Sequence, residues 1–375
     1  MKIITIVGAR PQFIKAAPMS TAIDKYNKTC HDADRIDEII IHTGQHFDKN
    51  MSDIFFEQLG IPQPKYNFGI NDVSHGAMTA RILERTEAVL INEAPDIVIV
   101  YGDTNSTLAG ALAASKLHIP IAHIEAGLRS FNRQMPEEIN RVITDHISDL
   151  LFCPTFQAVE HLKNEGITKN VFHVGDVMYD AALQAAQQVT QITGEKDNPL
   201  VKFGLEPDNY FLATVHRAEN TDYKQRLYSI LIALTELNKQ KKVVFPMHPR
   251  TADKISIFGF NDIAGKLNLI EPVSFLDMVC LEKNASIILT DSGGVQKEAY
   301  FHSVPCITLR DETEWTETVD AGWNILAGAE TNRILLAAAT QKKTAAGSYI
   351  AEYGNGRSAK KILNCIMLKP WSECK

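Results

Sequence analysis

Acidic side chains of this sequence follow short apolar runs, in positions where they could transfer protons. Asp103 comes two residues after one such run, and Glu125 ends another. Glu137 and Arg141 are four residues apart in a helical pattern, so we expect the arginine to orient that carboxylate. Taken singly, each acid could be a helix cap or a surface ion pair. Grouped carboxylates repel one another and lose hydration on burial, so acid/base chemistry is the better reason for all three.

A pair of glycines after another apolar run has the character of a phosphate-binding loop. The segment Asp291-Ser292-Gly293-Gly294 opens a helical pattern, and glycines let backbone N–H groups approach a phosphate closely. Glu298 follows about one turn later, where a carboxylate can accept both hydroxyl groups of a ribose. The alternative is a plain helix-opening turn followed by a surface glutamate.

Basic residues also follow apolar runs, in both halves of the chain. The segment Gly8-Ala9-Arg10-Pro11 begins a helical pattern, and its free amide groups and Arg10 could converge on an anion, with Lys15 one turn further on. His216 holds the corresponding position in the second half, so we expect it to bind ligand. His248 is more simply a structural histidine. An ordinary turn with a solvated Arg10 is the alternative, and one glycine does not make a dinucleotide fingerprint.

The elements that must position these groups alternate between short β-branched strands and longer helical segments. This alternation indicates parallel sheets buried on both faces, and it runs through both halves of the chain. The predicted fold class is therefore α/β with two Rossmann-like, doubly wound domains, whose strand ends would face a shared cleft. The expected strands are Lys2–Val7, Glu38–Thr43, Ile97–Tyr101, Ile119–Glu125, Leu150–Cys153, Tyr210–Val215, Lys242–Met247, Leu267–Ile270, Ser286–Thr290 and Pro305–Leu309.

Length and loop-forming residues divide the chain near its middle. At 375 residues it exceeds what one hydrophobic core usually supports. A boundary is expected at Val174-Gly175-Asp176-Val177, followed by a polar helix and the loop Gly194–Pro199. We expect a first domain of residues 1–176 and a second of residues 177–355. The helical segment Ser358–Leu368 could pack on either domain.

Composition excludes several classes of partner. A net charge of -7 and a pI near 6.0 argue against a nucleic-acid face. The six cysteines are scattered without a C-x-x-C pair, which predicts neither a zinc site nor a disulfide framework and fits the reduced thiols of a cytoplasmic protein. The run Lys2–Val7 is too short for the apolar core of a signal peptide. No stretch of about 18 apolar residues is present, so we expect no membrane insertion.

Taken together, the segments resemble the non-hydrolysing UDP-N-acetylglucosamine 2-epimerase family. The resemblance extends from the first strand to beyond residue 310, with several motifs in the same order. These motifs are Gly8–Lys15, Gly102–Thr104, His123–Arg129, Pro136–Arg141, His216–Asn220 and Thr290–Gln296.

The resemblance implies a glycosyltransferase-B architecture with the active site in the interdomain cleft, a C-terminal helix (about residues 356–375) that returns to the first domain, and a homodimer. It also implies a reaction without metal or nicotinamide, in which a base removes the C2 proton as UDP departs and UDP re-adds to a 2-acetamidoglucal. The resemblance further implies that Asp103, Glu125 and Glu137 transfer protons, with Arg141 beside Glu137. The implied contacts with the diphosphate come from Lys15, Arg10 and His216, which stabilise it, and from Ser292, Gly293 and Gly294, which cradle it. Glu298 would hold the ribose, and Val273 and Met278 would lie at the uracil pocket.

The sequence departs from the main family at several of these places. Trp315 stands where the family has an arginine, and Val273 and Met278 stand where it has a glutamine and a phenylalanine. Gln12-Phe13 and Trp315 are more similar to a branch that acts on UDP-2,3-diacetamido-2,3-dideoxyglucuronate, so the C3 and C6 groups of the substrate stay open. In some family members a second substrate molecule activates the enzyme, and Gln45-His46 lie in the matching segment.

Two other functions fit the same architecture. A glycosyltransferase would use the fold and the phosphate loop to move a sugar from UDP to an acceptor, but it would not need acids at C2. A nucleotide-sugar sensor would bind without turnover, and the presence of all three acids disfavours it.

Overall fold

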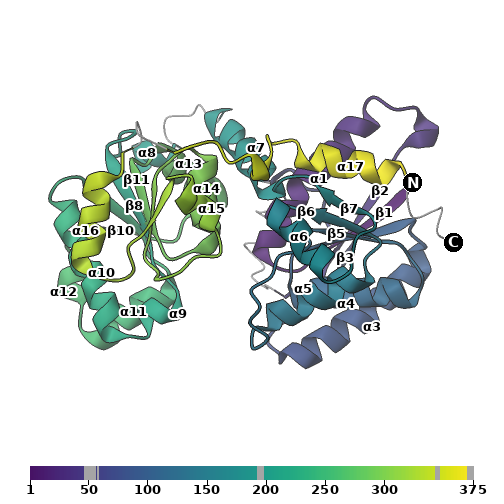
Figure 1. The fold of residues 1–375 in the computed structure, drawn as a ribbon, viewed down its shortest axis with the longest axis horizontal. Coiled ribbons are helices and arrows are strands. Elements are labelled where there is room, and N and C mark those ends of the chain that lie inside the picture. Colours follow the sequence, from purple (N-terminus) through teal and green to yellow (C-terminus); the bar gives the residue numbers. More distant parts are fainter. Residues whose placement is uncertain (46–55, 57–58, 192–197, 343–346, 370–375) are drawn as a thin grey trace. The chain divides into compact units, whose positions relative to one another are not determined.

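The chain forms two compact units, and its computed structural model describes residues 1–45, 56, 59–191, 198–342 and 347–369. Unit 1 comprises Met1–Ala181 and Ala351–Lys375, and unit 2 comprises Ala182–Ile350 (Figure 1). The units thus change over after residues 181 and 350, where the sequence led us to expect changes near 176 and 355.

Unit 1 is built on a seven-stranded parallel sheet in the order β3-β2-β1-β4-β5-β6-β7. Every residue of β4, β5 and β6 is buried, as expected for strands that are covered on both faces. Because the strands are parallel, their carboxyl ends lie at one edge of the sheet. The strands are β1 (Lys2–Val7), β2 (Asp37–His42), β3 (Tyr66–Asn67), β4 (Ile97–Tyr101), β5 (Ile121–Ile124), β6 (Leu150–Cys153) and β7 (Val171–His173).

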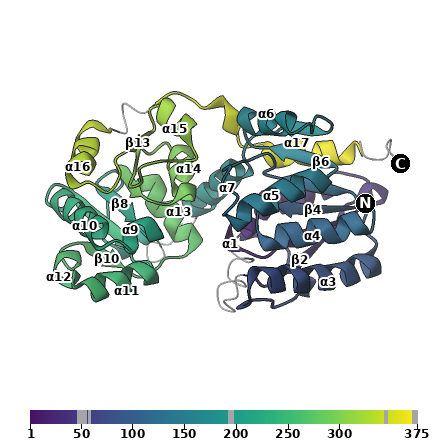
Figure 2. The same ribbon diagram turned by 60° about the horizontal axis from the view of Figure 1, so that its bottom comes forward.

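Helices cover both faces of this sheet. α3, α4 and α5 lie side by side on one face, whereas α1 and α17 pack together on the other (Figures 1 and 2). The helices are α1 (Arg10–Asn27), α3 (His75–Glu93), α4 (Asn105–Lys116), α5 (Pro136–Ile147), α6 (Phe156–Asn164) and α17 (Ser358–Met367), with 3-10 turns at Asp32–Asp34 and Ala351–Tyr353. A further helix, α7 (Val177–Gln191), begins in unit 1 and continues beyond Ala181 into unit 2.

The C-terminal helix α17 is fixed to unit 1 at its first turn. The Asp180 carboxylate accepts the backbone N–H of Ser358 at 3.0 Å and that of Ala359 at 2.9 Å. These are two of the donors that a helix N-terminus leaves without an intrahelical partner. Ile362 and Ile366 of α17 are fully buried. These contacts join α17 to the first unit.

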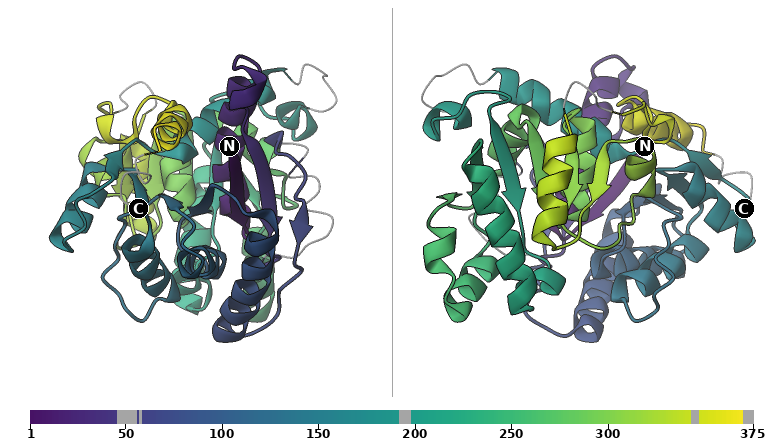
Figure 3. Two further views of the ribbon diagram at one scale, coloured as in Figure 1. Left: turned by 90° about the vertical axis from the view of Figure 1, so that its right-hand side faces the viewer. Right: turned by 60° about the vertical axis from the view of Figure 1, so that its left-hand side comes forward.

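Unit 2 repeats the design with a six-stranded parallel sheet in the order β10-β9-β8-β11-β12-β13, with helices on both faces (Figure 3). Its strands are β8 (Tyr210–Thr214), β9 (Lys242–Pro246), β10 (Asn268–Ile270), β11 (Ile287–Thr290), β12 (Cys306–Thr308) and β13 (Asn324–Leu326). Its helices are α8 (Pro199–Lys202), α9 (Ala218–Thr221), α10 (Lys224–Asn238), α11 (Pro249–Phe258), α12 (Asn261–Ala264), α13 (Phe275–Asn284), α14 (Gly293–Phe301), α15 (Thr316–Asp320) and α16 (Thr331–Thr340).

The ten strands expected from the sequence are confirmed, with limits that differ by two residues or fewer. Three further strands were not expected: β3, β7 and β13. Each lies at an edge of its sheet, has only two or three residues, and is partly exposed. An edge strand does not need the continuous apolar run that marks a central strand, so the pattern used for the others misses it.

Candidate functional site

In unit 1 the carboxyl ends of β4 and β5 bring four candidate residues together: Lys15, Asp103, Glu125 and Arg141. The Lys15 ammonium, from α1, forms an ion pair with Glu125, and each side chain is only 11% exposed. Gly102 faces this pair, because a Cβ there would lie 3.0 Å from Glu125 Oε2 and 3.3 Å from Lys15 Nζ. The φ of Gly102 is +62°, so both its space and its backbone conformation favour glycine.

Glu125 has an unusual backbone conformation for a residue with a side chain. Its φ is +71°, in the left-handed region, which costs about 1–2 kcal/mol for residues other than glycine. The N–H groups of Glu125 and Ala126 both donate to the Phe152 carbonyl at 3.1 Å, and this holds the turn in place. The fold thus fixes the Glu125 carboxylate in position despite local strain, a feature often found at functional sites.

The expected pairing of Arg141 with Glu137 is wrong. Arg141 instead pairs with Asp103 and with Glu138, whose Oε2 lies 3.1 Å from Nη1. Glu138 is buried and also accepts the backbone N–H and the hydroxyl of Ser130, both at 2.8 Å. Burial raises the pKa of Glu138, but the Ser130 hydrogen bonds and the Arg141 charge outweigh it and hold the pKa below its usual range. The Glu137 side chain makes no hydrogen bond or ion pair with any other residue that the structure describes.

The turn between β1 and α1 does not offer free amide groups, contrary to expectation. The N–H groups of Gly8 and Ala9 donate to Gln12 Oε1 at 2.8 and 3.0 Å. The other end of this buried amide, Gln12 Nε2, donates to the Tyr101 carbonyl at 2.9 Å. The glutamine of the first helical turn folds back and takes up the donors. Arg10, the first residue of α1, is half-buried.

The sequence analysis did not identify His123, a buried histidine of β5 that supports the Gly102 turn of this site. In the fully buried His123, Nε2 lies 2.7 Å from the Gly102 carbonyl oxygen and Nδ1 lies 2.7 Å from Asp145 Oδ1. Asp145 also accepts a hydrogen bond from Arg129 at 2.7 Å. Burial raises the pKa of Asp145, but His123 and Arg129 outweigh it, so its pKa is lowered. A buried polar side chain needs hydrogen-bond partners, so a histidine within the apolar run of β5 was the sequence signal that could have indicated this network.

In unit 2 the carboxyl ends of β8 and β11 meet at Asp291. This fully buried carboxylate accepts the backbone N–H groups of His216 and Arg217, both at 3.0 Å, and Asn220 Nδ2 at 3.1 Å. Its Oδ1 also lies 3.5 Å from His216 Nδ1. Asp291 therefore anchors the turn that carries His216, a role that the sequence analysis did not give it.

His216 lies against a second histidine. Its ring stacks on that of His248 with centroids 5.3 Å apart. Burial lowers the pKa of His216, His248 and Arg217 lower it further, and the opposing effect of Asp291 is smaller. His248 Nδ1 accepts the Arg250 N–H at 3.2 Å and caps α11, which fits the structural role expected for it.

The N-terminus of α14 begins with the two glycines, as the phosphate-loop interpretation requires. Ser292 is the N-cap residue, and no side-chain hydrogen bond caps the helix among the described residues. Gly293 and Gly294 are its first two residues, so their N–H groups belong to the positive end of the helix dipole. Glu298, on the same helix, is half-buried.

The two residues expected at the uracil pocket lie near the end of β10. Val273 follows this strand, and Met278 lies on α13. Both are partly buried and pack against a hydrophobic cluster that includes Leu212, Val244 and Ile288. Both side chains therefore form part of the border of this hydrophobic core.

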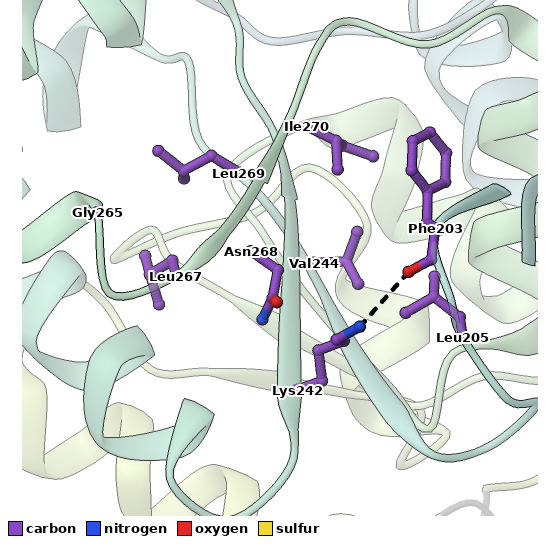
Figure 4. A pocket seen from close by; sticks show the side chains of 9 residues that line it. All are labelled: Phe203, Leu205, Lys242, Val244, Gly265, Leu267, Asn268, Leu269 and Ile270. Atoms are coloured by element: carbon purple, nitrogen blue, oxygen red, sulfur yellow. Dashed lines mark hydrogen bonds between the residues drawn. The ribbon is translucent and has the colours of Figure 1, made fainter.

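A hollow of about 360 Å³ runs beside the edge strand β10, and none of the candidate residues lines it (Figure 4). Lys242 Nζ lies 3.4 Å from the Phe203 carbonyl oxygen at the rim of this hollow.

No group of side chains with a metal-binding arrangement occurs in the part of the chain that the structure describes. Likewise, no helix among the described residues is long and apolar enough to cross a membrane. His46, named for a second substrate molecule, lies outside the described residues.

Comparison with known proteins gives matches along nearly the whole chain. A sequence model of the family described as UDP-N-acetylglucosamine 2-epimerase matches residues 28–367. A "UDP-N-acetylglucosamine 2-epimerase homolog" from Methanococcus maripaludis is 53% identical, over 98% of this chain and 99% of the relative. A "UDP-2,3-diacetamido-2,3-dideoxy-D-glucuronate 2-epimerase" from Pseudomonas aeruginosa is 51% identical, over 96% of this chain and 98% of the relative.

A solved structure agrees with these sequence matches. The crystal structure of a UDP-GlcNAc 2-epimerase from Methanocaldococcus jannaschii, in complex with UDP-GlcNAc and UDP, has a TM-score of 0.83 and 46% identity. The match covers 98% of this chain and 100% of that chain. With the two parallel sheets, it confirms the predicted fold class of two Rossmann-like domains of the glycosyltransferase-B type.

Proposed function

Because this chain belongs to the UDP-N-acetylglucosamine 2-epimerase family, we propose that it inverts C2 of a UDP-linked 2-acetamido sugar without net hydrolysis. The observation that carries the proposal is the cluster of unit 1, where Glu125 pairs with Lys15 and Asp103 pairs with Arg141 at neighbouring strand ends. Carboxylates held in this way can exchange a proton with a carbon centre. A protein that only binds a nucleotide sugar does not need them.

The proposed reaction is an elimination followed by an addition. A carboxylate removes the C2 proton, the C2–H electron pair forms a C1–C2 double bond, and the C1–O bond breaks to release UDP. The intermediate is a 2-acetamidoglucal. A second group then protonates C2 from the opposite face while a UDP oxygen bonds to C1 again, so that no atom is gained or lost. Two proton-transfer groups are required because the proton leaves one face and arrives on the other.

The roles in unit 1 follow from the charge partners of the three acids. Asp103 and Glu125 are carboxylates in ion pairs, and this is the form that accepts a proton. Glu137 has no cationic partner among the described residues, and we assign it delivery of a proton to the other face. His123 fixes the Gly102 carbonyl, and through it the Asp103 turn.

The roles in unit 2 concern the nucleotide. The amide groups at the start of α14, with Ser292, Gly293 and Gly294, are suited to the diphosphate. His216, held by Asp291, would contribute a further positive group when it gains a proton. We also carry over the remaining implied contacts, which are Arg10 and Lys15 with the diphosphate, Glu298 with the ribose, and Val273 and Met278 with the uracil.

For the substrate we propose UDP-N-acetylglucosamine and its C2 epimer, with UDP-2,3-diacetamido-2,3-dideoxyglucuronate as the second candidate. The second candidate is favoured by the 51% identical relative that carries this activity in its name. Each sugar should be incubated with the protein in D2O without any acceptor, and C2 should be followed by NMR. Incorporation of deuterium at C2 with inversion supports the epimerase and identifies the substrate. If neither sugar exchanges its C2 proton, the proposal fails and a glycosyltransferase becomes the better interpretation.

We further propose a homodimer that works in the cytoplasm. The support for a partner subunit is an exposed apolar group at and before α5, where Phe131 is 73%, Ile143 39% and Met135 38% exposed. The support for the cytoplasm is that the five described cysteines are all unbridged. Light scattering at several concentrations measures the first, and fractionation of the native cells measures the second.

A further inference from the structure

The indole of Trp315 holds a hydrogen-bond donor without a partner. Its Nε1 atom is inaccessible to solvent and makes no hydrogen bond with any residue that the structure describes. Burial of a donor without a hydrogen-bond partner destabilises the folded state, so each such donor in a native structure calls for an explanation. The other described indole of this unit does have a partner, since Trp323 Nε1 donates to the Ser348 carbonyl at 2.8 Å.

The Trp315 donor lies beside the glycine that opens α14. A Cβ on Gly293 would lie 3.4 Å from Trp315 Nε1, 3.8 Å from Arg217 Nη2 and 3.7 Å from Glu314 Oε2. The Glu314 carboxylate is already engaged, since Arg310 Nη1 donates to it at 2.9 Å. An indole N–H, a guanidinium and the engaged Glu314 carboxylate therefore surround the position of a Cβ on Gly293, the first residue of the helix.

The rest of the Trp315 residue is held firmly. Its backbone N–H donates to Thr313 Oγ1 at 3.1 Å, and its carbonyl accepts the Thr318 hydroxyl at 2.7 Å. The buried Lys297 ammonium lies 4.0 Å from the ring centroid of Trp315. A cation over an aromatic face is attracted to the ring, which fixes the orientation of the indole.

We propose that Trp315 Nε1 donates a hydrogen bond to a phosphate oxygen of the nucleoside diphosphate bound at the start of α14. This assignment rests on the proposed function, because it takes UDP as the ligand of unit 2. A phosphate oxygen at this position completes the unused donor and adds a charge-assisted hydrogen bond. Trp315 would then act as a neutral donor beside the positive charges of Arg217 and Lys297.

The first test observes the donor directly in the unmodified protein. The chain has three tryptophans, so a sample labelled with 15N at the indole gives three N–H resonances, which Trp315→Phe, Trp323→Phe and Trp371→Phe assign. Saturation with UDP should move the Trp315 resonance downfield, and uridine should not. A response to UMP identifies the first phosphate, and a response to UDP alone identifies the second. A Trp315 resonance that stays in place while calorimetry shows UDP binding overturns the inference.

The second test measures affinity. Trp315→Phe keeps an aromatic face for Lys297 but removes the N–H, and we expect it to weaken UDP binding about tenfold or more and to leave uridine binding unchanged. Trp323→Phe is the matched control and should bind UDP as the wild type does. Equal UDP affinity in wild type and Trp315→Phe overturns the inference, whereas loss of affinity for UDP and uridine alike shows a structural role and also overturns it. If the wild type binds no UDP at all, the proposed function itself is contradicted.

Discussion

Asp291 accepts the backbone N–H of His216 at 3.0 Å while its carboxylate is fully buried at the end of β11. One side chain thereby joins two adjacent strand ends, and it also receives Arg217 N–H and Asn220 Nδ2. A buried charged acceptor that serves three donors is costly to lose, so we expect this residue to contribute to stability as well as to the position of His216.

Asp291→Ala should lower the free energy of unfolding of unit 2 by about 3 kcal/mol, because three donors lose one fully buried, charged acceptor together. Urea denaturation followed by circular dichroism measures the change. Asp311→Ala is the control, since this side chain is 64% exposed and pairs with Arg226 at the surface, and its effect should stay below about 1 kcal/mol. A loss as small as that in the Asp291 variant would contradict the anchoring role.

His216 should give UDP binding a pH dependence. The pKa of His216 in the folded protein is lowered, mainly by burial. Without ligand, the histidine of the unfolded chain therefore takes up a proton first, as the pH falls below about 6.5. The stability that the neutral, buried His216 contributes is present above this pH and is lost as the pH falls through the pKa of the folded protein. Phosphate charge beside the ring favours the protonated form and raises the pKa again. UDP binding should therefore take up protons near pH 6.

Calorimetry in buffers of different ionisation enthalpy measures this proton uptake. UDP itself titrates near pH 6, so the informative quantity is the difference between the wild type and His216→Gln at the same pH. We expect the variant to take up fewer protons and to bind more weakly. Identical uptake in the two proteins would show that His216 does not contact the phosphates.

Much of the architecture could be predicted from the sequence because central parallel strands have continuous apolar runs. The candidate residues were found at the ends of these runs, and Lys15, Asp103, Glu125 and Arg141 do meet there. The sequence could not indicate which carboxylates would form ion pairs with Arg141. Glu138 competes with Glu137 for it through a buried loop contact that helix spacing does not show.

Other features depend on tertiary contacts that a single sequence does not contain. Gln12 takes the amide donors of the first turn because Tyr101, 89 residues away, accepts its other end. The left-handed backbone of Glu125 is held by hydrogen bonds to Phe152. Such positions violate local preferences and are therefore the ones that sequence rules predict least well.

The three acids should make unequal contributions to turnover. Asp103→Asn, Glu125→Gln and Glu137→Gln should each keep the fold and UDP affinity, and turnover should fall by about 100-fold or more where a proton transfer is lost. Turnover and exchange of the C2 proton with solvent should be measured together by NMR. Glu160→Gln, at a surface position 59% exposed, is the control and should behave as the wild type.

Exchange identifies the role of each acid. A variant that exchanges the C2 proton without inverting the centre has lost the group on the far face, and we expect this of Glu137→Gln. A variant that neither exchanges nor inverts has lost the initial removal of the proton. If all three variants epimerise at nearly the wild-type rate, the acids are structural caps and the proposed chemistry is wrong.

Asp180→Ala should loosen α17 without affecting unit 2. Two helix N–H groups lose their acceptor, which should cost about 1–3 kcal/mol locally. Hydrogen exchange followed by mass spectrometry should show faster exchange in residues 358–367 and unchanged exchange in α10. Asp24→Ala, on the exposed surface of α1, is the control. Unchanged exchange in α17 would mean that its apolar face alone holds it.

The return of α17 to unit 1 also has a consequence for how the chain folds during synthesis. The ribosome releases residues 182–350 before the segment that completes unit 1. Domains tend to fold as they emerge, and here unit 2 has all its residues while the face of α1 that packs against α17 is still uncovered. The nascent protein should therefore pass through a stage in which unit 2 is native while unit 1 still exposes apolar surface. At this stage a chaperone could bind the apolar surface that α17 later covers.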